Sequence, residues 1–379
     1  MQEKDIKLEL YDQEEMKQAI RELFSYQKFL DGMKAFLPEQ LTNQILHIKD
    51  SIETAYDFQK NIIHPFLKVI QKISITGLTA SGLEQLDARQ SYLFISNHRD
   101  IVMDPAFLNT ILFEHGFQTS QIAIGDNLMM DRISELLFRI NKSFEVKRSG
   151  TPRELYEHSM RLSTYIKDLI TNNKDSVWIA QREGRAKDGN DRTQIGLLNM
   201  LYLCGKDELK QHFQGLSIVP VAISYEYDPC GMLKTMEYLS KQANTGVQRT
   251  FQKDVEHILL GLKGQKGEVH FHFDKPLREE LDALDHAATK KQKLEILAAL
   301  IDKSIHLHYK LHPVNYIAYD LLMKTDKYRH QYNKEALEYH IQFFEDQLKQ
   351  LKPEEYEAGR QYLLTMYANP VINKDSYQD

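Results

Sequence analysis

Short apolar runs alternate with helical segments through the middle of this 379-residue chain, and this alternation limits its fold more than any other feature. Seven runs have the length and composition of buried strands, at residues 73–78, 92–96, 121–125, 144–147, 177–181, 216–226 and 268–273. Helical patterns are expected between them, at residues 104–114, 131–140, 152–171, 193–204 and about 232–243. Strands that alternate with helices predict an α/β fold with a mostly parallel or mixed central sheet flanked by helices.

Helical patterns without strands extend this central part on both sides. In the N-terminal part, large apolar side chains recur at spacings of three to five, and Pro38 is expected to end one helix. The C-terminal part is helical with many tyrosines, and Pro370 is expected to interrupt it. We therefore predict a helical region at 1–72, an α/β domain at 73–277 and a second helical region at 278–379.

Composition and charge narrow the class of protein. The chain is 42% hydrophobic and 27% charged, so it should fold rather than stay disordered. A net charge of -6 argues against a general nucleic-acid binder. The two cysteines, Cys204 and Cys230, form no C-x-x-C motif, which fits a reducing setting. No window approaches the roughly 18 apolar residues of a membrane span. We expect a cytoplasmic protein whose membrane contact, if any, is peripheral and at the inner face.

Polar residues follow four of the predicted strands. His98 follows the strand that ends at residue 96, and Asn127 follows the strand that ends at residue 125. Arg148 ends a third strand, and a charged loop that begins at Gln181 follows a fourth. Because sites in open α/β sheets lie outside the carboxyl ends of the strands, these four clusters can converge on one site.

His98 is the candidate catalytic base. An imidazole titrates near neutrality and can take a proton from a hydroxyl, while a neighbouring carboxylate fixes its tautomer. Asp104 and Asp100 are both close enough in sequence to orient it. Asp104 has a second interpretation as the cap of a helix that begins with Pro105.

The loop at residues 181–189 is the candidate phosphate site. It carries Arg182, Arg185 and Lys187 among glycines, and arginine offers a planar fork of donors that suits phosphate. The alternative is a charged loop that is simply solvated.

Neither a metal site nor a serine hydrolase is expected. His306, His308 and His312 lie in a helical stretch where spacings of two point to different faces. His270 and His272 share one face of a strand, but no third ligand is evident. The chain contains no G-x-S-x-G motif that could present a serine nucleophile.

The polar clusters, in this order and spacing, resemble the glycerolipid acyltransferase family over roughly residues 74–277. Asn97-His98-Arg99 with Asp104-Pro105 looks like the first motif of that family, its His/Asp catalytic pair. Residues 125–128 (Gly-Asp-Asn-Leu), with Phe144 and Arg148, are similar to the second motif, and Glu183-Gly184-Arg185 with Lys187 and Gly189 to the third, the phosphate-binding loop. Residues 219–225 and 267–276 resemble the fourth motif and the closing strand.

The resemblance implies an O-acyltransferase that needs no cofactor. It would move a fatty acyl group from acyl-CoA or acyl-carrier protein to a hydroxyl of glycerol-3-phosphate or 1-acylglycerol-3-phosphate. Its implied partners are the acyl donor, a small phosphorylated or lipid acceptor and a membrane surface, with no nucleic acid. His98 and Asp104 would be catalytic, and the implied substrate-binding residues are Arg99, Asn127, Arg148, Glu183, Gly184, Arg185 and Lys187.

The sequence departs from the family pattern at two places. The family has four residues between its His and Asp, whereas this chain has five, and Met103 occupies the usual Asp position. The third motif of the family commonly has two glycines before its arginine, whereas here Arg182-Glu183-Gly184 precedes Arg185. These departures leave two alternatives open: a different hydroxyl acceptor, such as an acyl-amino-acid lipid, or a non-catalytic lipid-binding protein.

Overall fold

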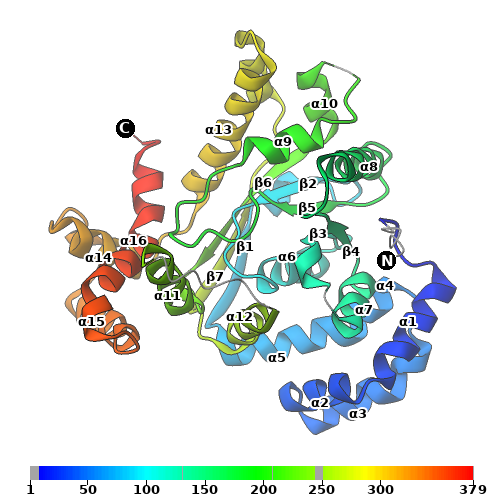
Figure 1. The fold of residues 1–379 in the computed structure, drawn as a ribbon, viewed down its shortest axis with the longest axis horizontal. Helices are drawn as coiled ribbons and strands as arrows, with labels where there is room; N and C mark the ends of the chain where they lie inside the picture. Colours follow the sequence, from blue (N-terminus) through cyan, green and yellow to red (C-terminus); the bar gives the residue numbers. More distant parts are fainter. Residues whose placement is uncertain (1–7, 130, 207, 244–250, 379) are drawn as a thin grey trace.

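A seven-stranded sheet forms the centre of the computed structural model, which describes residues 8–129, 131–206, 208–243 and 251–378 (Figure 1). The strand order is β1-β7-β6-β2-β5-β3-β4. The strands are β1 (Gly77–Ser81), β2 (Leu93–Ser96), β3 (Gln121–Gly125), β4 (Ser143–Val146), β5 (Val177–Ala180), β6 (Ile218–Tyr225) and β7 (Glu268–Phe273). β7 pairs antiparallel with β6, and the other pairings are parallel. The predicted mixed, mostly parallel sheet is confirmed.

Helices surround the sheet and extend from it at both ends of the chain (Figure 1). The N-terminal helices are α1 (Gln13–Ser25), α2 (Gln27–Phe36), α3 (Glu39–Ile48), α4 (Ala55–Phe58) and α5 (His64–Ser74). The central helices are α6 (Met103–Glu114), α7 (Arg132–Ile140), α8 (Pro152–Thr171), α9 (Ile195–Leu201), α10 (Leu209–Gly215), α11 (Gly231–Gln242) and α12 (Phe251–Lys263). The C-terminal helices are α13 (Lys290–His308), α14 (Pro313–Met323), α15 (Lys334–Leu348) and α16 (Tyr356–Asp375).

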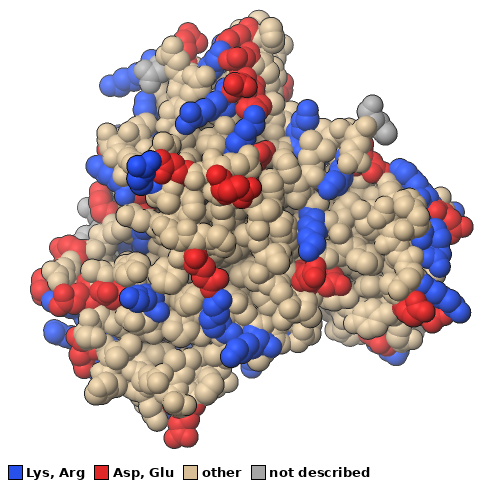
Figure 2. All heavy atoms as spheres, turned by 180° about the vertical axis from the view of Figure 1, so that it is seen from behind, with Lys and Arg blue, Asp and Glu red and all other residues tan. Residues whose placement is uncertain are grey.

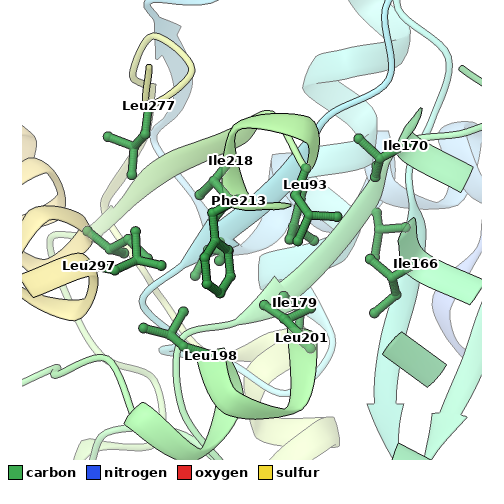
Figure 3. Close-up of a cluster of buried hydrophobic side chains, with 14 of the residues drawn as sticks. Leu93, Ile166, Ile170, Ile179, Leu198, Leu201, Phe213, Ile218, Leu277 and Leu297 are labelled. Carbon is green, nitrogen blue, oxygen red and sulfur yellow. The ribbon is translucent and has the colours of Figure 1, made fainter. Parts of the chain in front are cut away.

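Alternating side chains of the central strands build one core on each face of the sheet. Leu93 and Ile95 of β2 join the core under α8, α9, α10 and α13, part of which Figure 3 shows. Phe94, between them, joins the core under α5 and α6. Because successive strand residues point to opposite faces, a strand that is apolar on both faces must be covered on both. The central strands are therefore rigid supports for the loops that leave them.

The strand register gathers the loops that carry the predicted site. Ser96 at the end of β2 lies opposite Ala180 of β5 and Val221 of β6, so these three strands share one direction and level. β3 pairs with β5, and β4 with β3, in the same direction. The loops after β2, β3, β4 and β5 consequently leave from the same edge of the sheet.

The N-terminal helices form a core of their own with α7. Leu23 of α1, Ile45 of α3 and Leu136 of α7 are all fully buried in it. Arg132 of α7 donates two hydrogen bonds to the carboxylate of Glu22, at 2.7 and 2.6 Å. As expected, Pro38 lies between two helices, at the N-cap of α3.

The C-terminal helices pack in two places. α13 covers the sheet beside β6, whereas α14, α15 and α16 pack on one another and on α11. The expectation that Pro370 interrupts a helix is wrong, because it lies inside α16. Proline has no N–H for the carbonyl four residues before it, here that of Met366. A Cβ built on Gly189 would lie 2.2 Å from this carbonyl oxygen, so the site loop packs directly on α16 there.

One strand begins well away from its predicted start, and two helices, α10 and α12, were not predicted. β1 begins at Gly77 rather than at residue 73, because α5 continues through Ser74, whose hydroxyl donates to the Ile70 carbonyl. α12 was not predicted, although it proves to contact the site.

Among the described residues, no helix combines the length and apolar character that crossing a bilayer requires. Figure 2 shows acidic and basic side chains interspersed over the rear face rather than separated by sign.

Candidate active site at the carboxyl ends of the strands

The loop after β2 brings His98 against Asp104. The Nδ1 atom of His98 lies 2.8 Å from Oδ2 of Asp104, which is fully buried, while 12% of the His98 side chain is exposed. A carboxylate only accepts hydrogen bonds, so Nδ1 carries the proton and Nε2 keeps its lone pair. This is the arrangement in which an imidazole can act as a general base.

The additional residue between His98 and Asp104 is absorbed by a tight turn. Oδ2 of Asp104 also accepts the backbone N–H groups of Arg99 and Asp100, at 2.6 and 3.0 Å. Oδ1 accepts the hydroxyl of Tyr225 at 2.8 Å, from the end of β6. The turn thus folds around the carboxylate, and Met103 at the usual Asp position points into the core.

Asp100 has a different role from Asp104. Its Oδ1 atom accepts the backbone N–H groups of Val102 and Met103, at 3.0 and 2.8 Å, where α6 begins. Burial, together with the nearby charge of Asp104, raises its pKa. Of the two carboxylates that could orient His98, the structure therefore places only Asp104 within hydrogen-bond distance.

Buried aromatic and amide groups support the His98 loop. The ring of Trp178, on β5, meets the His98 ring edge-on with centroids 5.6 Å apart. Its Nε1 donates to Oγ of Ser96, which is fully buried and therefore no nucleophile. The amide of Asn97 both accepts from and donates to the backbone of Ile223, at 2.7 and 2.9 Å. These bonds fix the loop to the neighbouring strand.

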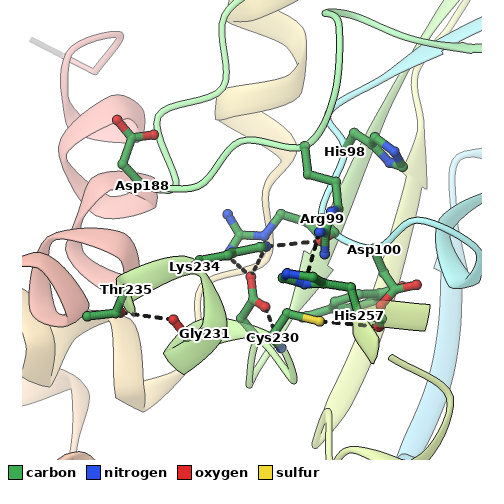
Figure 4. A network of polar contacts seen from close by, with 12 residues as sticks. His98, Arg99, Asp100, Asp188, Cys230, Gly231, Lys234, Thr235 and His257 are labelled. Carbon is green, nitrogen blue, oxygen red and sulfur yellow. Dashed lines mark hydrogen bonds and ion pairs between the residues drawn. The ribbon is translucent and has the colours of Figure 1, made fainter. Parts of the chain in front are cut away.

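Arg99 lies in a buried network of charges rather than at the surface with the other predicted substrate residues. Only 3% of its side chain is exposed, and its guanidinium lies 3.6 Å from Asp228 and 4.0 Å from Asp191. Lys234 of α11 donates to the Arg99 carbonyl at 3.0 Å and to Asp228 at 2.5 Å. Burial raises the pKa of Asp191 to about 6. Figure 4 shows Arg99 directed into this network and His98 directed away from it.

Asn127, Arg148 and Glu183 meet where β3, β4 and β5 end. Nη1 of Arg148 donates to Oδ1 of Asn127 at 3.2 Å, and its Nε lies 3.8 Å from Oε1 of Glu183. A side chain on Gly125 would collide with this guanidinium, because a Cβ built there lies 2.5 Å from its Cζ. The structure therefore brings together three predicted residues from three different loops.

The predicted phosphate loop lies beside His98. The backbone N–H of Ala186 donates to the carbonyl of His98 at 3.2 Å, which joins this loop to the loop after β2. Gly184 adopts a φ of +68°, in the left-handed region that favours glycine. Arg185 is half-buried, and its Nη2 lies 3.1 Å from Nδ1 of His257. Residues 98 and 185 thus belong to the same edge of the sheet.

Sequence reasoning missed two residues that hold the cations of this loop. Glu237 of α11 forms an ion pair with Lys187 and accepts from Nε2 of His257 of α12 at 3.0 Å. These hydrogen bonds and charges outweigh burial and lower the pKa of Glu237 to about 2. The available signal was weak, since an apolar spacing of three to four around Leu259 marks α12 as a helix without marking its polar face.

One histidine cluster elsewhere has the composition of a metal site but not the geometry. His272, Asp274 and His308 each offer a ligand atom within 4.8 Å of the others. The two imidazole rings are stacked, with centroids 4.0 Å apart and planes inclined by 13°. Parallel rings direct their nitrogen lone pairs side by side, so the two cannot both point at one ion about 2.1 Å away. We base no metal chemistry on this cluster.

Comparison with known proteins identifies a related family model and several relatives. A family model described as Acyltransferase matches residues 77–224, which run from β1 to β6 and include the His98–Asp104 pair and the predicted phosphate loop. This match, and the glycerol-3-phosphate acyltransferases among the relatives, support an acyltransferase of the glycerolipid type. The resemblance found in the sequence is thereby confirmed, whereas the site residues remain predictions.

The curated relatives of this chain are distant and longer. A glycerol-3-phosphate acyltransferase of Pseudomonas fluorescens is 23% identical over 308 residues, 76% of this chain and 35% of that protein. A glycerol-3-phosphate acyltransferase of Pseudomonas putida is 25% identical over 234 residues, which are 60% of this chain and 27% of that protein. The chain therefore spans about a third of the length of these relatives. The crystal structure of the 1-acyl-sn-glycerophosphate acyltransferase PlsC from Thermotoga maritima aligns over 77% of this chain and 92% of that one, at 10% identity and a TM-score of 0.37.

Proposed function

We propose that this acyltransferase moves a fatty acyl group from a thioester, acyl-CoA or acyl-carrier protein, to a hydroxyl of glycerol-3-phosphate or 1-acylglycerol-3-phosphate. The observation that carries the proposal is the 2.8 Å contact between His98 Nδ1 and the buried Asp104. It leaves Nε2 as a base on a side chain that is partly open to solvent. The names of the curated relatives support glycerol-3-phosphate as the acceptor.

The reaction needs one proton transfer and one displacement. Nε2 of His98 takes the proton of the acceptor hydroxyl, and Asp104 stabilises the imidazolium that forms. The hydroxyl oxygen attacks the thioester carbonyl, and the carbon–sulfur bond breaks. The thiolate leaves and recovers the proton from His98, so the products are an oxygen ester and a free thiol. General-base catalysis of this kind contributes on the order of 10²–10⁴ in rate.

The acceptor phosphate would be held by Arg148, Arg185 and Lys187. Each of these side chains already has a partner. Arg148 contacts Asn127 and Glu183, Arg185 contacts His257, and Lys187 contacts Glu237. A phosphate dianion must therefore compete with carboxylates for two of the three. Bidentate bonding from arginine is the interaction that favours phosphate in this competition.

We also propose that the outer face of α12 meets a lipid surface, because one substrate of the reaction carries a fatty chain. Leu259 and Leu260 are 44% and 37% exposed there. Together with Val255, Glu256 and Lys263 they line an open hollow of about 440 Å³. Leucines beside a lysine suit the boundary between acyl chains and anionic headgroups.

Thiol release from palmitoyl-CoA and from palmitoyl-acyl-carrier protein tests the proposal. We expect release only when glycerol-3-phosphate or 1-oleoyl-glycerol-3-phosphate is present, and a loss of about 10²–10⁴ in kcat in His98→Ala. His330→Ala, an exposed histidine on the C-terminal helices, should match the wild type. Near-normal turnover in His98→Ala would refute the assignment.

The partnered cations favour a second candidate. If Glu183 and Glu237 keep Arg148 and Lys187 from a phosphate, the acceptor is a hydroxyl lipid without one, such as an acyl-amino-acid lipid. Thiol release with that lipid alone would select this candidate. Lipid binding without any thiol release would indicate a non-catalytic binding protein.

A further inference from the structure

The cations of the predicted phosphate loop are connected to each other through side chains that lie outside the region matching the acyltransferase model. Arg185 contacts His257, His257 contacts Glu237, and Glu237 contacts Lys187. Glu237 lies on α11 and His257 on α12, both beyond residue 224. The loop therefore does not set the positions of its own cations.

We propose that His257 is a positioning residue that holds Arg185, and through Glu237 also Lys187, in place for the phosphomonoester of the acceptor. This inference rests on the proposed function and deepens it. It assigns part of the acceptor affinity to α11 and α12, which lie beyond the residues that match the acyltransferase model.

The hydrogen bonds of His257 fix its tautomer. An arginine side chain only donates, so the Nδ1 atom of His257, 3.1 Å from Nη2 of Arg185, must accept. A carboxylate only accepts, so Nε2, 3.0 Å from Oε1 of Glu237, must donate. The ring is thus a neutral bridge with no freedom to flip, and only 4% of the residue is exposed. Such a bridge transmits the position of α12 to the guanidinium.

Arg185 keeps donors that this bridge does not use. Within the part of the chain that the structure describes, its Nη1 atom is buried and has no hydrogen-bond partner. The residue as a whole is only half-buried, beside the loop that carries His98. A guanidinium that is anchored through one nitrogen and has an unused one can bind two oxygens of an anion without losing its anchor. A phosphate dianion is the group that this arrangement fits.

α12 also contacts two other loops of the site, in addition to its contact with Arg185. Asn127 donates to Asp254 of α12 at 3.3 Å. A Cβ built on Gly261 would lie 2.2 Å from Oδ2 of Asp100, so the helix backbone lies directly against the loop that carries His98. One helix thus contacts three loops with predicted site residues, and Figure 4 shows His257 among the residues of the neighbouring network. A shift of this helix would move the cations relative to His98.

Three substitutions at His257 separate positioning from simple packing. His257→Phe keeps a ring but removes both hydrogen bonds, His257→Asn keeps an acceptor for Arg185, and His257→Gln keeps a donor for Glu237. The matched control is His212→Phe on α10, because His212 is also buried and also bonded, to the carbonyl of Leu201 at 2.9 Å. Both Phe variants lose buried hydrogen bonds, but only His257→Phe loses a contact with the phosphate loop.

The measurements are KM for each acceptor, KM for palmitoyl-CoA, kcat, and the Kd of inorganic phosphate by calorimetry. We expect His257→Phe to raise the acceptor KM and the phosphate Kd about tenfold or more, with kcat and the donor KM within about threefold. His257→Asn should recover most of the affinity, and His212→Phe should leave all four values unchanged. Folding is checked by circular dichroism. If the Phe variant does not fold, His257→Gln, which loses the acceptor for Arg185, carries the test and should raise the acceptor KM and the phosphate Kd.

The outcomes distinguish this inference from the proposed function. If the wild type transfers to a phosphorylated acceptor and His257→Phe, or His257→Gln in its place, keeps the wild-type acceptor KM and phosphate Kd, the positioning role is refuted while the function stands. A loss in kcat without any change in acceptor KM or phosphate Kd also refutes it. A wild type that uses no phosphorylated acceptor and binds no phosphate refutes both.

Discussion

Asp104 is the residue on which the geometry of the site depends most. Four donors reach its carboxylate, from His98, from two backbone N–H groups of the same turn and from Tyr225 on β6. The pairing of His98 with an aspartate in this turn could be predicted from the sequence. Which aspartate it was could not, because an additional residue changes the direction of each following side chain. Arg99 was assigned by its neighbours in sequence, and only its ion partners from distant segments place it in the interior.

Substitution of the two aspartates by asparagine should separate their roles. Asp104→Asn presents an amide to His98 in place of the buried carboxylate, so we expect kcat to fall by about 10²–10⁴, the range of general-base catalysis. Asp100→Asn keeps an oxygen for the start of α6 and removes a carboxylate whose pKa burial raises. Its kcat should stay within about fivefold of the wild type. Steady-state kinetics on both variants make the comparison, and equal losses would contradict it.

At the scale of elements, the sequence predicted the strands of the sheet and most of the central helices, but not α10 and α12. Each central strand is a short run that is apolar on both faces, which is a strong local signal. α12 was missed because its buried face is partly polar, with Asp254 and His257 turned toward the site. Local patterns do not show which loops such a face will contact. α11 and α12 are joined through Glu237, and this contact makes their pairing dependent on pH.

Glu237 should contribute to acid stability. Its hydrogen bonds from His257 and Lys187 and its ion pair with Lys187 outweigh burial and lower its pKa from 4.5 to about 2 in the folded chain. A carboxyl group with a depressed folded pKa stabilises the fold above its unfolded pKa, and this contribution is lost as the pH falls from about 4.5 to about 2. Glu237→Gln should therefore be less stable by about 1–3 kcal/mol at pH 7. It should also lose less stability than the wild type between pH 5 and pH 2.5.

Urea unfolding at pH 7, 5, 4 and 2.5 checks this expectation. Glu157→Gln on α8 is the control. The Glu157 side chain is 58% exposed, and the ion pair described for it is with Arg153 of the same helix. A Glu237→Gln curve parallel to that of the wild type over this range would show that the carboxylate is not stabilised by folding.

At the scale of the whole molecule, the C-terminal helices hold the site loops from behind. The hydroxyl of Tyr367 on α16 accepts the backbone N–H of Asp228, whose carboxylate faces Arg99. Gly189 packs on the Met366 carbonyl of the same helix. The helical character of this region could be predicted from sequence. Its contact with the site could not, because it joins residues that are 139 positions apart in one case and 177 in the other, and whose side chains carry no shared pattern.

Two glycine substitutions in one loop test this contact. Gly189→Ala and Gly184→Ala both place a Cβ at a positive φ, +74° and +68°, which costs about 1–2 kcal/mol. Only at Gly189 does the Cβ meet a backbone oxygen, while at Gly184 nothing lies within 4 Å. Gly189→Ala should therefore lose about 1–3 kcal/mol more than Gly184→Ala. It should also expose α16 to limited proteolysis. Equal unfolding free energies for the two variants would show that α16 moves away from the added Cβ without a loss of stability.

The crowding around one carboxylate has a consequence for how protons move through the molecule. With its oxygens occupied by four donors, Asp104 has little capacity left for a water molecule, an ion or a substrate group. It cannot swing outward to become a base without breaking the turn that surrounds it. A proton that moves between this pair and the open side of the site must therefore pass through Nε2 of His98.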